Sequence, residues 1–288
     1  MILVDFSQVM ISNTMVHLGK NETTVDEGMM RHMILNSLRM SKNTYGKKYG
    51  ELVICCDDRS YWRRDIFPYY KGHRKEKRDK SIVDWNQVYG VLNKIREEIR
   101  ETFPYKVILV EKAEADDIIG VLAKKFGTVL NNESTERNLV LSSDKDFGQL
   151  QKFANVDQYS PITKKWLRIE NPKDFLMEHI IRGDSGDGVP NFLSVDSAIM
   201  DKSIRQTAIA KKKVAVWLRQ KPSEFCDDNM MRNFKRNEQL VDLDMVPEAI
   251  SSAIINQFEN YKVPERRGLL NYFIKNKLKN LMDCIGEF

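Results

Sequence analysis

The sequence predicts an α/β protein with a mostly parallel, doubly wound sheet and a helical C-terminal region. Short apolar, β-branched runs alternate with segments of helical periodicity over residues 1–180. Strands separated by helices of this length build a parallel sheet. Fully apolar runs such as residues 52–56 fit strands that are buried on both faces. After about residue 172 no clear strand pattern remains, and helical patterns dominate to the end.

Each element follows from its local pattern. We expect strands at residues 2–4, 52–56, 107–110 and 139–141, a weaker strand at 156–159, and an edge strand at 166–169. Helical periodicity between them predicts helices at 27–41, 85–102 and 116–126. The C-terminal region should contain helices at 174–181, 208–219 and 268–281. The chain is therefore divided into an α/β domain, residues 1–180, and a helical region, residues 181–288.

Composition excludes several classes of protein. Hydrophobic residues make up 42% of the 288 residues, and no apolar run approaches the roughly 20 residues of a membrane helix. The N-terminus has no basic segment before its apolar run, so it predicts a buried strand and an intracellular, cytoplasmic protein. The four cysteines lack CxxC spacing, so neither a disulfide framework nor a zinc site is expected. The four histidines lack metal-ligand spacing, and no histidine catalyst is expected.

Acidic residues follow the predicted strands. Asp5 ends the first strand, Asp57 follows the second, and the segment Glu114-Ala-Asp-Asp117 follows the third. Asp144 and Asp146 follow the fourth. Ligands of open α/β sheets bind outside the carboxyl ends of the strands. We therefore expect all these acids at one edge of the sheet.

Their spacing supports convergence at that edge. Asp144 and Asp146 are two residues apart, so an extended backbone would point both the same way. Glu114 and Asp116 converge only if Glu114 lies just before a helix and reaches around its first turn. A further pair, Asp184 and Asp187, lies in a glycine-rich segment that allows a tight loop over the same edge.

Clustered carboxylates raise one another's pKa, and divalent cations relieve this repulsion. Magnesium prefers oxygen ligands. Two such ions about 3.5–4 Å apart can activate water and stabilise the leaving oxygen of a phosphodiester, with no Ser/His or Cys/His pair required. The alternative is that the acids are separate helix caps and surface residues. The predicted metal ligands are Asp5, Asp57, Glu114, Asp116, Asp117, Asp144, Asp146, Asp184 and Asp187.

Two basic segments suggest a polyanionic partner. Residues 61–80 hold eight Lys or Arg against three acids and interleave them with aromatics, as single-strand-binding segments do. Lys71 and Arg74, one helical turn apart, could grip one phosphate. Residues 201–220 hold six basic residues against one acid and could contact duplex phosphates. The alternative in both cases is an exposed basic helix face.

These motifs together resemble the 5′-nuclease superfamily of flap endonucleases and polymerase-associated 5′ exonucleases. They read VDFSQ, CCDDRSYWRR, YYKGHR, AEADDI, SSDKDFGQL and GDSGDGVP, and the likeness is strongest to T-even-type phage ribonucleases H, nearly end to end. The resemblance implies a first metal surrounded by Asp5, Asp57, Glu114 and Asp116. It implies a second metal surrounded by Asp144, Asp146, Asp184 and Asp187, with Asp116 near both and Asp117 a further member of the cluster.

The resemblance also implies roles for the basic segment, an arch near residues 61–85. Lys71 and Arg74 would hold the scissile phosphate, and Tyr70 would stack on a base. The family removes RNA primers and 5′ flaps from duplexes. In this interpretation Lys71, Arg74 and Asp146 are the catalytic candidates, and two Mg²⁺, replaceable by Mn²⁺, are the cofactors.

One departure concerns the glycine hairpin that follows the acidic loop in many members and binds potassium and duplex. Residues 189–196 lack its glycines, which puts the potassium site in doubt. Five basic residues could contact the duplex in place of that hairpin: Lys202, Arg205, Lys211, Lys212 and Lys213. We expect a monomer, in the host cytoplasm if the gene is a phage's.

The expected partners are DNA and RNA–DNA hybrids with a 5′ single-stranded end. The sequence leaves open the RNA or DNA preference, and whether a single-strand-binding protein or sliding clamp docks on the C-terminal region. A non-catalytic junction-binding protein is the alternative function, although it predicts missing metal ligands. A metal phosphatase is less favoured because Asp5-Phe-Ser7 lacks the Asp-x-Asp of haloacid-dehalogenase-type enzymes.

Overall fold

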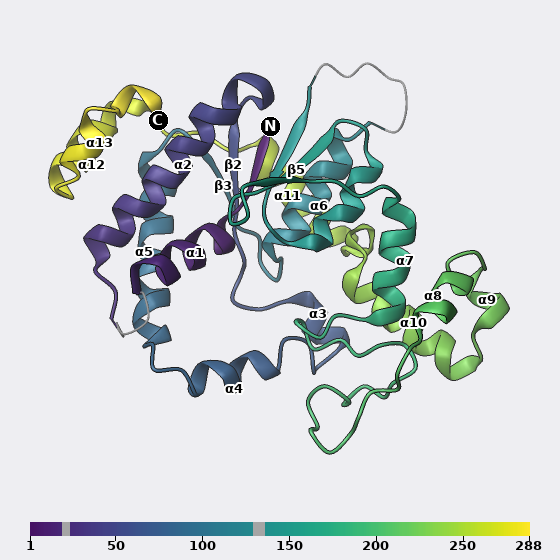
Figure 1. Ribbon diagram of the computed structural model, residues 1–288. Coiled ribbons are helices and arrows are strands. Elements are labelled where there is room, and N and C mark those ends of the chain that lie inside the picture. Colours follow the sequence, from purple (N-terminus) through teal and green to yellow (C-terminus); the bar gives the residue numbers. More distant parts are fainter. Residues whose placement is uncertain (19–23, 129–135) are drawn as a thin grey trace.

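The computed structural model describes residues 1–18, 24–128 and 136–288, which include a six-stranded sheet (Figure 1). Its strands are β1 (Ile2–Asp5), β2 (Leu52–Cys55), β3 (Lys106–Ile108), β4 (Asn138–Leu141), β5 (Val156–Ser160) and β6 (Lys165–Leu167). Their order is β3-β2-β1-β4-β5-β6. The first five are parallel, and β6 runs antiparallel to β5 at the edge. The predicted mostly parallel sheet and its edge strand are confirmed.

The register of the central strands brings their carboxyl ends level. Val4 of β1 pairs with Ile54 of β2 on one side and with Leu141 of β4 on the other. Asp5 and the residues that follow β2 and β4 therefore leave the sheet at the same edge.

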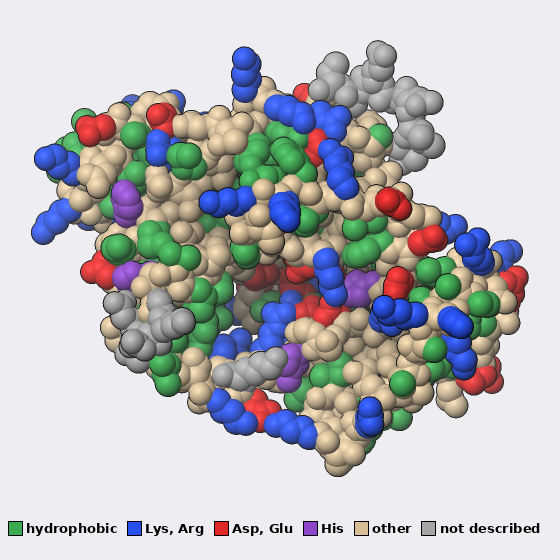
Figure 2. Space-filling model, viewed as in Figure 1, with side chains coloured by type: hydrophobic (Ala, Val, Ile, Leu, Met, Phe, Trp, Pro, Cys, Tyr) green, Lys and Arg blue, Asp and Glu red, His purple; other side chains and the backbone are tan. Residues whose placement is uncertain are grey.

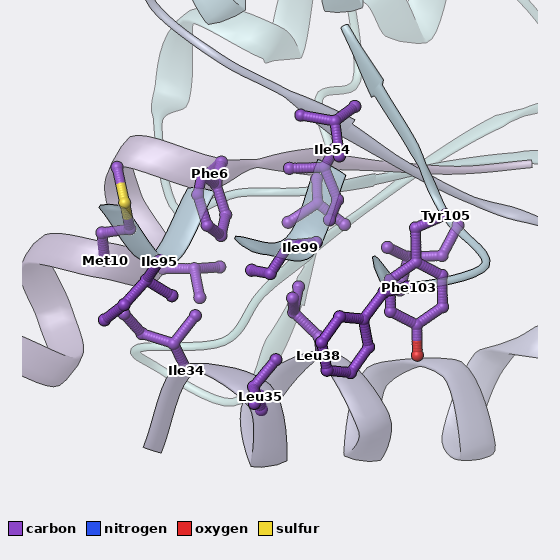
Figure 3. Close-up of a cluster of buried hydrophobic side chains, with 14 of the residues drawn as sticks. Phe6, Met10, Ile34, Leu35, Leu38, Ile54, Ile95, Ile99, Phe103 and Tyr105 are labelled. Carbon is purple, nitrogen blue, oxygen red and sulfur yellow. The ribbon is translucent and has the colours of Figure 1, made fainter. Parts of the chain in front are cut away.

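Three long helices cover one face of the sheet: α1 (Phe6–Leu18), α2 (Glu27–Tyr49) and α5 (Trp85–Thr102). Ile2 and Val4 point toward this face and join a core that includes Phe6, Ile34 and Ile99 (Figure 3). The sequence pattern predicted no helix at the position of α1, and it ended α2 eight residues early, at 41 rather than 49.

The opposite face is covered by α6 (Ala115–Phe126), the 3₁₀ helix η1 (Lys145–Lys152) and α11 (Glu248–Glu259). Leu3 and Val53 alternate with their neighbours on the strands and point into this second core. Both faces of the sheet are thus buried, as the apolar strands predict.

The C-terminal region is helical, as predicted, but it packs in three places. Its remaining elements are α7 (Pro172–Arg182), α8 (Lys211–Trp217), α9 (Pro222–Phe225), α10 (Asp228–Val241), η2 (Leu243–Met245), η3 (Arg266–Gly268), α12 (Leu269–Lys275), α13 (Lys279–Met282) and η4 (Ile285–Glu287). Phe192 and Phe234 form a third core among α7, α8 and α10. Phe273 and Phe288 return to the core beneath α2 and α5. The predicted helix 268–281 is broken because Lys277 adopts a positive φ of 56°.

Two short helices, α3 (Trp62–Ile66) and α4 (His73–Asp79), connect β2 to α5. Figure 1 shows α4 as a bridge that stands away from the sheet. The four cysteines are free, as expected. Among the helices of the described residues, none is long and apolar enough to cross a membrane.

Candidate active site

A first group of carboxylates gathers where β1, β2 and β4 end. Asp5 accepts hydrogen bonds from the amide of Gln8 (3.0 Å) and from Ser142 Oγ (2.9 Å). Asp57 accepts from the amide of Ala115 (2.7 Å) and from Ser7 Oγ. These donors fix both carboxylates at the sheet edge and link four segments that are far apart in the sequence.

Electrostatics show how close these acids lie. Burial, followed by the charge of Asp57, raises the pKa of Asp5 to about 7. Burial, followed by the charge of Asp144, raises the pKa of Asp116 well above its ordinary value. Acids whose pKa rises together gain most from a bound cation, because a cation restores their charged form.

A second group forms around Asp146 and Asp184. The ligand atoms of Asp146, His179 and Asp184 lie within 4.8 Å of one another. Asp146 and Asp184 line a cavity of about 20 Å³, together with Asp116 and Asp187. A space of this size holds a single water or ion. Burial raises the pKa of Asp146 to about 7, with Asp144 and Asp184 adding to the rise and His179 opposing it.

The unpartnered atoms and the donor types of the second group both fit a divalent cation. Asp146 Oδ1 and His179 Nδ1 are buried and have no hydrogen-bond partner. Buried polar atoms are normally satisfied, and these two lie 3.6 Å apart, too far to hydrogen-bond to each other, so both remain open to a ligand. The donors are mainly carboxylate oxygens, which Mg²⁺ and Mn²⁺ prefer.

His179 is the residue that sequence reasoning missed. It lies in the last turn of α7, and its Nε2 is 3.2 Å from Oδ2 of Asp184. Burial lowers its pKa, but Asp184 and Asp146 outweigh that effect, so the pKa is raised. The same contact holds the pKa of Asp184 below its ordinary value despite burial. Its five-residue distance from Asp184 matches no metal-ligand spacing, so only the fold reveals it.

The local geometry of Asp144 and Asp146 differs from the prediction. Asp144 is the N-cap of η1, and its Oδ1 accepts the amide of Asp146 (2.9 Å), so the backbone between them turns. The expectation of an extended backbone is therefore wrong. Asp144 is near enough to Asp116 and Asp5 for its charge to raise the pKa of both, while Oδ1 of Asp146 lies 3.6 Å from Nδ1 of His179.

Glu114 lies at the N-cap of α6, the position that convergence with Asp116 requires, and it is buried among cations. Arg63 Nη1 lies 2.9 Å from its Oε2, and Lys71 Nζ contacts its Oε1. Burial would raise the pKa of Glu114, but Lys71 and Arg63 hold it below the ordinary value. Glu114 is therefore ionised and already paired.

Asp117 lies beside Glu114, and its contacts fix the start of α6. Its Oδ2 accepts from the amide of Glu114 (2.9 Å) and from Trp62 Nε1 (3.0 Å), and its Oδ1 lies 2.7 Å from Arg63. The bond from the Glu114 amide completes the capping box of α6. With both oxygens engaged and no exposed surface, Asp117 has no free position for a metal in this structure.

Tyr70 differs from the expectation of base stacking. It is only 2% exposed, and its ring packs in the third core. Its hydroxyl lies 2.9 Å from Oε2 of Glu114 and 2.9 Å from Oδ2 of Asp187, and its single proton serves one of them. In this conformation the ring cannot meet a base, and Tyr70 instead connects the arch to the acids.

The acidic loop closes against the arch through Asp187. Arg74 pairs with Asp187 Oδ1, and the amide of Lys71 donates to the carbonyl of Asp187 (2.7 Å). Gly188 makes this approach possible. Its φ is +78°, and a Cβ there would lie 2.9 Å from the carbonyl oxygen of Tyr69. Lys71 and Arg74 thus meet the acids at the predicted place, although both cations already hold carboxylates.

The arch encloses a large basic pocket beside the acids. Its volume is about 920 Å³, and Asp57, Lys71, Arg74, Arg78 and Arg96 are among the residues that line it. Figure 2 shows the hollow, with acidic and basic side chains at its floor. Lys202 of the C-terminal region reaches Glu76 of α4 (2.7 Å), which ties the arch to the loop after α7.

The other predicted duplex-contact residues lie on the surface of the C-terminal region. Arg205 precedes α8, and Lys211, Lys212 and Lys213 form its first turn. All four are exposed, as is Lys202. The structure therefore leaves these cations accessible, and only Lys202 touches the arch in the contacts described above.

Comparisons with known proteins find relatives along the whole chain. A family model for the N-terminal resolvase-like domain of 5′-3′ exonucleases matches residues 1–178, and one for the C-terminal part of T4 RNase H matches residues 172–288. The ribonuclease H of Enterobacteria phage T4 is 33% identical over 296 residues, with 99% of this chain and 95% of that protein covered.

Two solved structures show the same fold. The T5 D15 protein co-crystallised with metal ions has a TM-score of 0.62 at 15% identity, over 91% of this chain and 99% of its own. The T5 5′-exonuclease with bound divalent zinc has a TM-score of 0.58 at 15% identity, over 90% and 98%.

Proposed function

We propose, from the premise that this chain belongs to the 5′-3′ exonuclease family, that it is a magnesium-dependent nuclease that removes RNA primers and 5′ flaps during phage DNA replication. Membership of this family shows that the chain is a nuclease, as the motifs of its sequence predict. The observation that carries the finer proposal is the convergence of acids from five chain segments on one sheet edge, two of them with a pKa near 7.

Two divalent ions would supply an activated water and stabilise the leaving oxygen of the scissile phosphodiester. Asp5, Asp57, Asp116 and Asp144 would hold one ion, with Glu114 beside them. Asp146, Asp184 and Asp187 would hold the other, with Asp116 near both. Ser142 and Ser7 orient the first set through Asp5 and Asp57, and His179 orients the second through Asp184.

The arch cations are proposed to exchange partners. Lys71 and Arg74 now neutralise Glu114 and Asp187. Divalent ions at the carboxylates would take over that neutralisation and leave the two cations for the scissile phosphate. Arg63 is fully buried and stays with Glu114 and Asp117, so the acidic side of the site keeps one fixed cation.

Duplex contact is proposed for the exposed cations of the C-terminal region: Lys202, Arg205, Lys211, Lys212 and Lys213. Contacts of this kind position a duplex without reading its sequence. A 5′ single strand would leave the duplex at the acidic edge and enter the basic pocket under α4.

The decisive experiment is a cleavage assay on a 5′-flap substrate with and without Mg²⁺. We expect Mg²⁺-dependent cleavage by the wild type. Asp146→Asn should lower the single-turnover rate by more than about 100-fold, because even outer partners of metal ligands are worth roughly 10–100-fold. Asp283→Asn, which changes an acid at the end of α13, is the control. Normal cleavage by Asp146→Asn would refute the site, and normal binding without any cleavage by the wild type would favour a junction-binding protein.

A further inference from the structure

An aromatic and basic patch lies outside the site described above, on β5, β6 and the end of α2. We call it the Trp166 patch, and it consists of Tyr45, Lys48, Arg137, Asp157, Tyr159, Trp166 and Arg168. Figure 2 shows hydrophobic side chains over β5 with Lys and Arg around them, above the hollow. The arch and the metal-site acids use none of these residues.

The patch follows from the pairing of the edge strand. Tyr159 of β5 stands opposite Trp166 of β6. Asp157 and Arg168 are each two residues away from this pair in sequence, so they lie on the same face, where they form an ion pair. The rings of Tyr159 and Trp166 are 5.2 Å apart in a T-shaped contact, and Tyr45 packs on both. This packing holds the indole fixed at its edge, yet Trp166 remains 44% exposed.

The residues of the Trp166 patch carry more positive than negative charge. Asp157 is buried and pairs with Lys48 (3.5 Å), Arg137 (2.8 Å) and Arg168 (3.1 Å). Three cations on one carboxylate leave an excess of two positive charges. The three cations remain 57%, 39% and 69% exposed at their side chains. Lys48 also lies 5.6 Å from the centre of the Trp166 indole, so charge and ring share one surface.

The patch is continuous with the metal edge. Ser160, which ends β5, is 2.6 Å from Ser143 through their hydroxyl groups, and Ser143 directly precedes Asp144. The amide of Ile162, in the turn between β5 and β6, also contacts Ser143 Oγ (3.4 Å). The turn that leads into β6 is therefore tied directly to the segment that carries Asp144.

We infer that the Trp166 patch is a second nucleic-acid site, which binds single-stranded nucleic acid by stacking a base on Trp166 and pairing phosphates with Lys48 and Arg168. An exposed, rigid ring beside cations is the arrangement that holds single strands. A duplex does not fit as well, because its bases are stacked on one another and present no free face except at an end. The inference rests on the proposed function in one respect only, namely that the ligand is a nucleic acid and therefore a polyanion.

The test uses full-length protein in EDTA, where no cleavage occurs, and a short fluorescent oligo(dT). Trp166→Ala should weaken binding by about 5- to 100-fold, the usual effect of losing one stacked base. Trp166→Phe keeps an aromatic face and should retain most of the affinity. Leu270→Ala removes an exposed apolar side chain from α12, and Lys221→Ala removes a charge at α9, so both are controls. Each variant is checked by its thermal unfolding midpoint.

A second readout does not depend on the folding of Trp166→Ala. Oligo(dT) should quench part of the tryptophan fluorescence of the wild type, and Trp166→Phe should lose that part. Lys71→Ala should keep it, which separates the patch from the arch. Equal quenching in wild type and Trp166→Phe, or equal weakening on oligo(dT) and blunt duplex, would overturn the inference. If the protein bound oligo(dT) through Trp166 but cleaved no flap substrate, the proposed function would be refuted and the inference about the Trp166 patch would stand.

Discussion

Lys71 Nζ lies 3.6 Å from Oδ2 of Asp187, while the backbone amide of the same lysine donates to the carbonyl oxygen of that aspartate. Lys71 has a positive φ of 54°, a conformation that costs free energy in a residue other than glycine. The acidic loop thus contacts both the side chain and the backbone of Lys71, and it anchors the arch beside the metal-site acids at this residue.

This relationship predicts that Lys71 affects the chemical step more than substrate binding. Lys71→Ala should slow single-turnover cleavage by about 100- to 1000-fold, the usual loss for a preorganised charge at the reacting group. Substrate affinity, measured in Ca²⁺ or EDTA, should fall much less. Lys75→Ala, which changes an exposed lysine on α4, is the control. An unchanged single-turnover rate would count against a phosphate role for Lys71.

The raised pKa values of Asp5 and Asp146 predict that magnesium stabilises the protein more as pH rises. Both values rise from 3.8 to about 7 on folding, so the folded protein binds more protons than the unfolded chain between those limits. Stability without metal should therefore fall as pH rises through this window. We expect Tm in EDTA to drop by several degrees between about pH 5 and pH 8, since about 1 kcal/mol corresponds to roughly 2–4 °C.

Added Mg²⁺ should reverse that drop, because it favours the charged carboxylates. Asp146→Asn removes one of the acids with a raised pKa and should make the fall of Tm with pH in EDTA less steep. Thermal unfolding followed by circular dichroism, with and without Mg²⁺, measures both effects. A metal-free Tm that stays level across the window would contradict the raised pKa values.

The buried Arg63 predicts a large loss of stability when its charge is removed. It pairs with Glu114 and Asp117 and donates to the carbonyl of Leu240 (2.8 Å). Arg63→Met leaves two buried carboxylates with less compensation, which should cost about 3–5 kcal/mol. Urea denaturation measures the change.

The double variant Arg63→Met with Asp117→Asn should recover part of that stability, because it removes one of the uncompensated charges. Arg59→Met, at an exposed arginine nearby, should stay within about 0.5 kcal/mol of wild type. Equal effects at Arg59 and Arg63 would show that the buried pairs contribute nothing specific.

The exposed lysines at the start of α8 predict salt-dependent binding of duplex. The triple variant Lys211→Ala, Lys212→Ala and Lys213→Ala should bind duplex more weakly at low salt. It should also lower the slope of log affinity against log salt by about 0.9 for each phosphate that the variant no longer neutralises. Lys221→Ala is the control. A slope that does not change would place the duplex elsewhere.

Much of the fold could be predicted because short stretches of sequence determine where its strands and several of its helices form. Apolar β-branched runs located the strands, and parallel register then placed Asp5, Asp57 and Asp144 at one edge without any knowledge of side-chain contacts. Glu114 could be placed at a helix N-terminus for the same local reason. The helix α1 was not predicted because its apolar and polar residues show almost no helical segregation, and it forms by packing on the sheet.

Sequence alone thus determined the parallel sheet, the edge at which the acids lie and the basic character of the arch. These follow from the hydrophobic periodicity, the alternation of strands and helices along the chain, and the positions of charged residues, all of which can be read from the sequence. Only the tertiary structure decided which acid keeps a free oxygen. It buried Asp117 and Tyr70, brought His179 beside Asp146, and set Lys71 against Asp187. Such pairings depend on desolvation and on contacts between distant segments, and neither is encoded in local spacing.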